Sequence, residues 1–163
     1  MAEGEFALMQ QHLDAALKTG LSKGRVPGGD HDLYAMLVDA AAQQRDKADL
    51  EKYAPLAEES ATRIDHKLHM AIAHRAWGVA HTLAGEYPQA EVRLRQALEI
   101  FAAYPAPWQV GRSLFEMGEL AHAQGKAEQA RDYFSKALMA FEELRAAPYE
   151  ARTRAMLENL GPV

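Results

Sequence analysis

The chain has 163 residues, of which 48% are hydrophobic and 25% charged, and its formal net charge is -5. This charge argues against a nucleic-acid surface, because such surfaces need clustered Lys and Arg to displace counterions from phosphates. The sequence has no cysteine, which excludes disulfides, thiolate metal ligands and cysteine nucleophiles. Frequent alanine and the scarcity of β-branched runs favour an all-α fold.

Signals for membranes or export are missing from the sequence. No stretch reaches the roughly 18 apolar residues that span a bilayer. The first residues also lack the basic-then-apolar order of a signal peptide. We therefore expect a cytoplasmic protein that makes no membrane contact.

The segment over residues 1–29 is predicted to form a single helix and a linker. Residues 3–18 place Phe6, Met9 and Leu13 on one face, which indicates an amphipathic lead helix. Residues 19–29 are rich in glycine and are predicted to connect this helix to the rest of the chain.

A first helix pair is predicted over residues 31–44 and 48–64. Asp30 is a suitable N-cap for the first of these helices. Pro55 lies inside the second helix, where it removes a backbone donor and clashes with the preceding turn. We expect a kink or a break at this position.

The second half of the chain repeats itself at a fixed interval of about 40 residues, and such an interval is typical of solenoids. The recurring residues are Gly78, Gly85, Gln89, Ala90, Ala97, Leu98 and Phe101, which return as Gly118, Gly125, Gln129, Ala130, Ala137, Leu138 and Phe141. Each unit is predicted as two helices joined at Gly85 or Gly125, where a helix end favours left-handed backbone. The predicted helices cover residues 66–84, 88–103, 108–124, 127–146 and 149–160.

The small residues of these units resemble the tetratricopeptide repeat pattern. The matching residues are Gly78, Ala90, Leu94 and Ala97 in one unit, and Gly118, Ala130, Phe134 and Ala137 in the next. A glycine inside a helix costs about 1 kcal/mol relative to alanine. We therefore expect Gly78 and Gly118 to mark close helix contacts, with Ala90 and Ala130 opposite them.

The resemblance implies a right-handed superhelical stack of antiparallel helix pairs. It predicts about three pairs, with single helices at both ends of the chain. Residues 1–29 would form the N-terminal segment, and residues 30–163 the array. The array would divide into 30–65, 66–105, 106–147 and a terminal helix over 148–161. The long interval is similar to that of repeats in bacterial multidomain signalling proteins, since the usual tetratricopeptide interval is about 34 residues.

In this family the first helices of the units line a concave face that binds a protein or peptide. By repeat position, the predicted binding residues are Ile72, Arg75, Val79, Thr82, Arg112, Phe115, Glu119 and His122. An arginine beside an exposed phenylalanine is typical of a recognition hot spot.

The resemblance favours a non-catalytic interaction scaffold within a signalling or regulatory protein. One alternative is a sensor module that binds a small ligand on the same face. Another is self-association, because a final helix without a capping repeat would leave an apolar edge uncovered.

We expect no metal, no cofactor and no enzymatic activity. His66 and His69 share one helix face, but zinc needs a third or fourth ligand from another element, and the sequence places none. Adjacent acidic residues such as Glu58 and Glu59 point about 100° apart on a helix and cannot share a substrate. No Ser or Thr stands with a histidine base in a recognisable catalytic motif.

Overall fold

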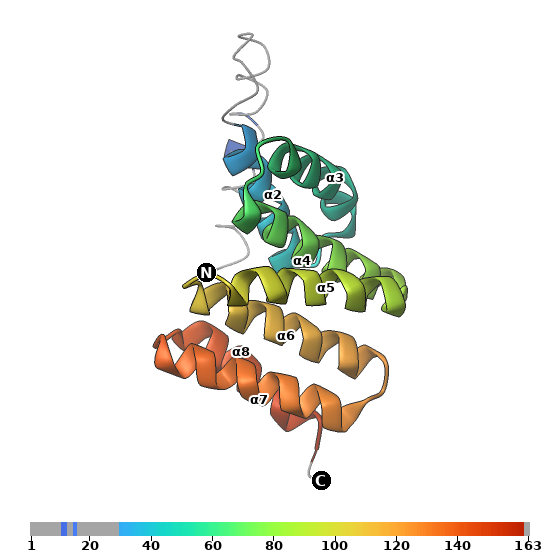
Figure 1. Ribbon diagram of the computed structural model, residues 1–163. Helices are drawn as coiled ribbons and strands as arrows, with labels where there is room; N and C mark the ends of the chain where they lie inside the picture. The colour runs from blue at the N-terminus through green and yellow to red at the C-terminus, as the bar shows by residue number, and fades with distance from the viewer. Residues whose placement is uncertain (1–10, 13–14, 16–29, 162–163) are drawn as a thin grey trace.

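A computed structural model describes residues 11–12, 15 and 30–161 of the chain (Figure 1). Its helices are α2 (Asp30–Gln44), α3 (Lys47–Arg63), α4 (Lys67–Ala84), α5 (Tyr87–Ala102), α6 (Pro107–Ala123), α7 (Ala127–Glu143) and α8 (Ala147–Asn159). Within these described residues there is no strand, and no helix is long and apolar enough to cross a bilayer. The all-α prediction is confirmed. The predicted lead helix and linker lie largely outside the described residues.

Helix starts recur at the repeat interval along the described array. Helices α3, α5 and α7 begin at residues 47, 87 and 127, and helices α4, α6 and α8 begin at residues 67, 107 and 147. The repeat that the sequence shows in its second half therefore includes the first pair. Figure 1 shows the helices stacked in chain order, from α2 and α3 at the top to α7 and α8 at the bottom.

The turn inside each helix pair uses left-handed backbone at one repeat position. Gly85 and Gly125 have φ values of 76° and 71° there, as the sequence predicted. The equivalent residue of the first pair is Arg45, with a φ of 57°. A left-handed non-glycine residue costs roughly 1–2 kcal/mol. Because arginine stands where the later pairs have glycine, the glycine pattern did not mark the turn of the first pair.

The mid-helix glycines mark the closest approach of the two helices in a pair. A Cβ atom added to Gly78 would lie 2.5 Å from Leu94, and one added to Gly118 would lie 2.6 Å from the Phe134 ring. Close packing at these glycines is therefore confirmed. The nearest atoms belong to Leu94 and Phe134, one turn beyond the alanines predicted to lie opposite.

Large side chains at repeated positions fill the space behind these contacts. Phe101 and Phe141, one repeat interval apart, are both fully buried. Leu94 and Phe134 are likewise completely buried, so the second helix of each pair presents matching apolar residues to the interior. This shared apolar interior joins consecutive pairs into one array.

The sequence predicted a kink or a break at Pro55; helix α3 continues through this residue, so the break is wrong. Proline lacks a backbone N–H, which leaves the carbonyl of Glu51 without its usual helical partner. Both residues are exposed, and water can therefore satisfy this carbonyl.

Candidate binding face

The helices α2, α4, α6 and α8 bring repeated positions together, and we call these positions the inner face. One set is Asp32, Ile72, Arg112 and Arg152; the others are Ala35, Arg75, Phe115 and Ala155, then Asp39, Val79 and Glu119, then Ala42, Thr82 and His122. The binding residues predicted from sequence are the α4 and α6 members of these sets.

Asp39 of α2 binds two arginines from two other helices. Its Oδ1 accepts a hydrogen bond from Arg75 Nη2 of α4 at 2.8 Å, and its Oδ2 accepts one from Arg112 Nη1 of α6 at 2.7 Å. Arg75 Nη1 also donates to the side-chain oxygen of Gln109 at 2.7 Å. Only 1% of Arg75 and 6% of Arg112 is exposed. These arginines therefore tie α2, α4 and α6 together from the inside.

Burial and neighbouring charges have opposing effects on the pKa values of this cluster. Burial would raise the pKa of Asp39, but the guanidinium groups of Arg75 and Arg112 outweigh it and lower the pKa to about 2. Burial lowers the pKa of Arg75 to about 10, which leaves the arginine charged at neutral pH. At neutral pH the cluster is thus an ionised carboxylate between two cations.

Arg45 forms a second polar bridge from the turn between α2 and α3 to α6. Its Nη1 lies 2.6 Å from Glu116 Oε2, and its Nη2 lies 3.0 Å from Glu119 Oε2. Burial raises the pKa of Glu119, an effect that the Arg45 charge opposes. The strained Arg45 backbone is thus accompanied by two ion pairs that hold the first pair against the third.

The structure places the predicted binding residues in two groups. Arg75, Val79, Arg112 and Phe115 are buried, whereas Ile72, Thr82 and Glu119 are half-buried and His122 is exposed. The expectation that Phe115 is exposed is wrong, since only 2% of this residue is accessible. Its ring lies 5.3 Å from that of Phe134, and the Arg152 guanidinium covers it at 4.5 Å. Phe115 is therefore a core residue beneath a cation.

A groove remains open on the inner face between α2, α6 and α8. It has a volume of about 540 Å³. Its lining residues are Asp39, Gln43, Trp108, Arg112, Ala146, Pro148, Tyr149 and Arg152. We call it the α6–α8 groove. Of the binding residues predicted from sequence, Arg112 alone lines it.

Aromatic contacts and a long-range hydrogen bond shape the groove. The rings of Trp108 and Tyr149 meet edge to face at 4.8 Å. The Tyr149 hydroxyl donates to Gln43 Oε1 at 2.8 Å, which joins α8 to α2. The two rings and Pro148 supply an apolar surface, and Arg112 and Arg152 supply positive charge.

Sequence reasoning missed Asp39 and Arg152, although a signal for both was present. Asp39 stands one repeat interval before Val79, and Arg152 stands one repeat interval after Arg112. Extending the repeat to both neighbouring units would have added these residues to the predicted face.

Residues 69–143 match a family model described as tetratricopeptide repeat. Residues 69–143 therefore form tetratricopeptide repeats. This match covers helices α4 to α7 and agrees with the paired-helix stack described above. Tetratricopeptide repeats generally mediate protein–protein interactions and are generally non-catalytic scaffolds. No curated protein matches the chain.

Proposed function

We propose that the chain binds an acidic segment of a partner protein in the α6–α8 groove, as part of a signalling or regulatory protein of the cytoplasm. The observation that carries the proposal is Arg152. Its guanidinium covers the Phe115 ring in a groove lining, and no carboxylate among the described residues lies within ion-pair distance of it. A cation positioned in this way is suited to a carboxylate from another molecule.

Charge on the inner face supports an acidic ligand. Arg45, Arg75 and Arg112 are each engaged by acidic residues of the chain, whereas Arg152 adds a further positive charge beside the groove. The charge of Arg152 opposes the rise in the pKa of Glu119, but the two side chains form no ion pair. Acidic segments would be steered toward the groove and away from the rest of the surface.

The apolar part of the groove supports a peptide that also carries a large apolar residue. Trp108 and Tyr149 are half-buried and line the groove with Pro148. Aromatic residues next to arginine are enriched among the residues that dominate binding energy. We therefore expect an acidic side chain at Arg152 and an apolar one against Trp108.

Peptide display on the immobilised full-length chain tests this proposal. A random peptide library is selected on the wild type, and enriched peptides are measured by calorimetry against Arg152→Glu, Trp108→Ala and the control Arg95→Glu. Arg95 lies on α5, which supplies no residue to the groove lining, and pairs with Glu91 at the surface. Circular dichroism establishes that each variant is folded.

The expected result is enrichment of acidic peptides that lose about tenfold or more in affinity with Arg152→Glu, since a hydrogen bond to a charged group contributes about 1.5–3 kcal/mol. Trp108→Ala should lower the affinity for these peptides as well, while Arg95→Glu should keep the affinity within about twofold of the wild type. Peptides that bind the wild type and Arg152→Glu equally would place the binding site elsewhere.

A further inference from the structure

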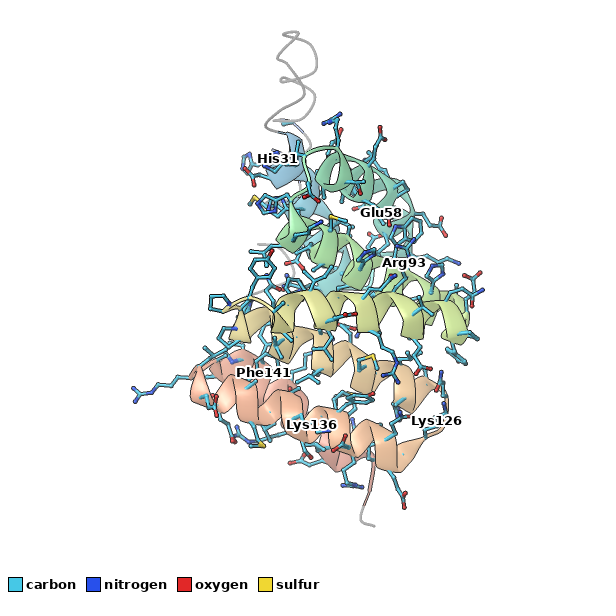
Figure 2. All side chains as sticks on the ribbon, viewed as in Figure 1. His31, Glu58, Arg93, Lys126, Lys136 and Phe141 are labelled. Atoms are coloured by element: carbon cyan, nitrogen blue, oxygen red, sulfur yellow. The ribbon has the colours of Figure 1, made fainter. Side chains whose placement is uncertain are left out.

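Four polar side chains gather where the first turns of α2 and α4 meet. His31 and Asp32 lie at the start of α2, and His66 and His69 at the start of α4. Figure 2 shows His31 at the N-terminal end of α2. None of the four residues lines the α6–α8 groove. This cluster is therefore separate from the proposed peptide site.

The donor atoms in the cluster are spaced as ligands of a shared cation would be. Asp32 Oδ1 lies 3.6 Å from His31 Nε2 and 3.5 Å from His69 Nε2. Donor atoms of all three residues lie within 4.8 Å of one another. These separations are too long for good hydrogen bonds. Ligands of tetrahedral zinc, at bond lengths near 2.0–2.2 Å, are about 3.3–3.6 Å apart.

The hydrogen bonding of the two imidazoles is incomplete. The Nδ1 atoms of His31 and His69 are buried, and neither has a hydrogen-bond partner among the described residues. A zinc ion held by the Nε2 atoms that face Asp32 would leave each Nδ1 as a buried N–H group, so the Nδ1 atoms are not the metal ligands. The spacing of the two Nε2 atoms and Asp32 Oδ1 is the observation that points to a metal.

No metal was expected from the sequence, because His66 and His69 lacked a third ligand from another element. The structure supplies His31 and Asp32 from α2. We propose that His31, Asp32 and His69 bind a zinc ion, with solvent in the remaining position. Imidazole nitrogen and carboxylate oxygen are both ligands that zinc accepts. Asp32 is exposed, so water can reach the ion.

His66 lies beside this site and has a different role. Its Nδ1 accepts a hydrogen bond from the backbone N–H of His69 at 3.3 Å and thereby caps α4. Its ring stacks on the His69 ring with centroids 3.8 Å apart. His66 therefore positions His69, and an asparagine in its place would preserve the cap.

Zinc binding by the full-length chain tests the proposal directly. Chain freed of metal by chelation is titrated with ZnCl₂ by calorimetry at pH 7.5, in parallel with His69→Ala, His31→Ala, His66→Asn and His122→Asn. His122 is an exposed histidine on α6 and serves as the control. Circular dichroism checks the fold, and His69→Gln replaces any alanine variant at that site that fails to fold.

We expect one zinc ion per wild-type chain. Loss of a supporting residue around a metal typically weakens binding by about 10–100-fold, so loss of the ligands His69 or His31 should weaken it by about 100-fold or more. The zinc affinity of His66→Asn should be at most about tenfold lower than that of the wild type, and the affinity of His122→Asn should equal it. Cobalt should give the intense visible absorption of a four-coordinate ion. Absence of zinc binding, or equal losses in His69→Ala and His122→Asn, would overturn the proposal.

Discussion

Asp39 holds two buried arginines at once, and this makes it the most constrained residue of the inner face. Each of its oxygens serves a different guanidinium, one from α4 and one from α6. Removing one member of a buried charge cluster leaves the others desolvated without compensation. The stability of the array should therefore depend strongly on this carboxylate.

Replacement of Asp39 by asparagine should lower the free energy of unfolding by about 3 kcal/mol at pH 7, the lower end for a buried pair, because Asp39 keeps some exposure. Urea titration measures this change. Asp132→Asn, at an exposed carboxylate paired with Lys136, is the control and should change stability by less than about 1 kcal/mol. Equal urea midpoints for Asp39→Asn and the wild type would contradict the assigned role.

The interaction of Asp39 with the two arginines should also make the stability of the folded chain depend on pH. The pKa of Asp39 is about 2 in the folded chain and near its ordinary value of 3.8 in the unfolded chain. Between these values the unfolded state binds more protons, so this contribution to stability is complete above pH 4 and is lost as the pH falls toward 2. Asp39→Asn lacks this contribution, and its stability should therefore vary less than that of the wild type over this range.

For single residues, the sequence predicted location on the inner face better than it predicted burial and contacts. Arg75 and Arg112 were placed on the inner face, where they lie, but they are buried and bound to Asp39. Repeat spacing indicates which positions line up along the array. It does not show how closely neighbouring helices cover them, because that depends on side chains from three helices at once.

Among the helices, the pairs α4–α5 and α6–α7 depend on contacts at mid-helix glycines. Gly118 of α6 faces the Phe134 ring of α7 without room for a methyl group. Helix pairs that approach this closely gain apolar contact along their whole length. The glycine thus weakens its own helix slightly and allows the pair to pack.

Gly118→Ala should destabilise the chain although alanine favours helix by about 1 kcal/mol, since overpacking costs typically 1–3 kcal/mol and moves a buried ring. Thermal unfolding measures the loss. Phe134→Ala is combined with it in a double-mutant cycle, where removal of the ring should make the alanine at position 118 less harmful; leucine would not serve, because Leu94 leaves no room at Gly78. Strictly additive effects would show that the two residues do not compete for space.

Helix boundaries were the most predictable feature of the chain. Gly85 and Gly125 ended first helices in both the prediction and the structure. Helix α3 does not break at Pro55, because proline chemistry predicts a lost backbone bond but not whether water replaces it. The turn at Arg45 also has left-handed backbone, but it could not be recognised from the sequence because the residue is not glycine.

Across the whole molecule, the inner face brings the first and last described helices into contact. Gln43 of α2 accepts a hydrogen bond from Tyr149 of α8, across 106 residues of sequence. No local pattern predicted this contact, because it results from small rotations added over successive units. Helix α8 otherwise packs on α7 and fully buries Thr153 alone among its residues.

Hydrogen exchange should therefore be faster in α8 than in α4 and α6, since local opening there breaks fewer buried contacts. Tyr149→Phe removes the hydrogen bond to Gln43 and should speed exchange in α8 by about fivefold, as expected for a bond worth roughly 1 kcal/mol. Mass spectrometry of peptides from each helix measures these rates. Tyr104→Phe, at an exposed tyrosine, is the control. Uniform exchange along the array would argue against a weakly held α8.

The ion pairs of the inner face do not follow the repeat interval that governs the apolar contacts. The positions equivalent to Arg75 and Arg112 in neighbouring units include Phe115 and Ile72. Duplication of a unit between α3 and α6 would preserve every glycine and aromatic contact but would carry Arg112 out of reach of Asp39. The buried charges therefore oppose insertion of a further unit between α3 and α6, although the glycine contacts would accommodate one.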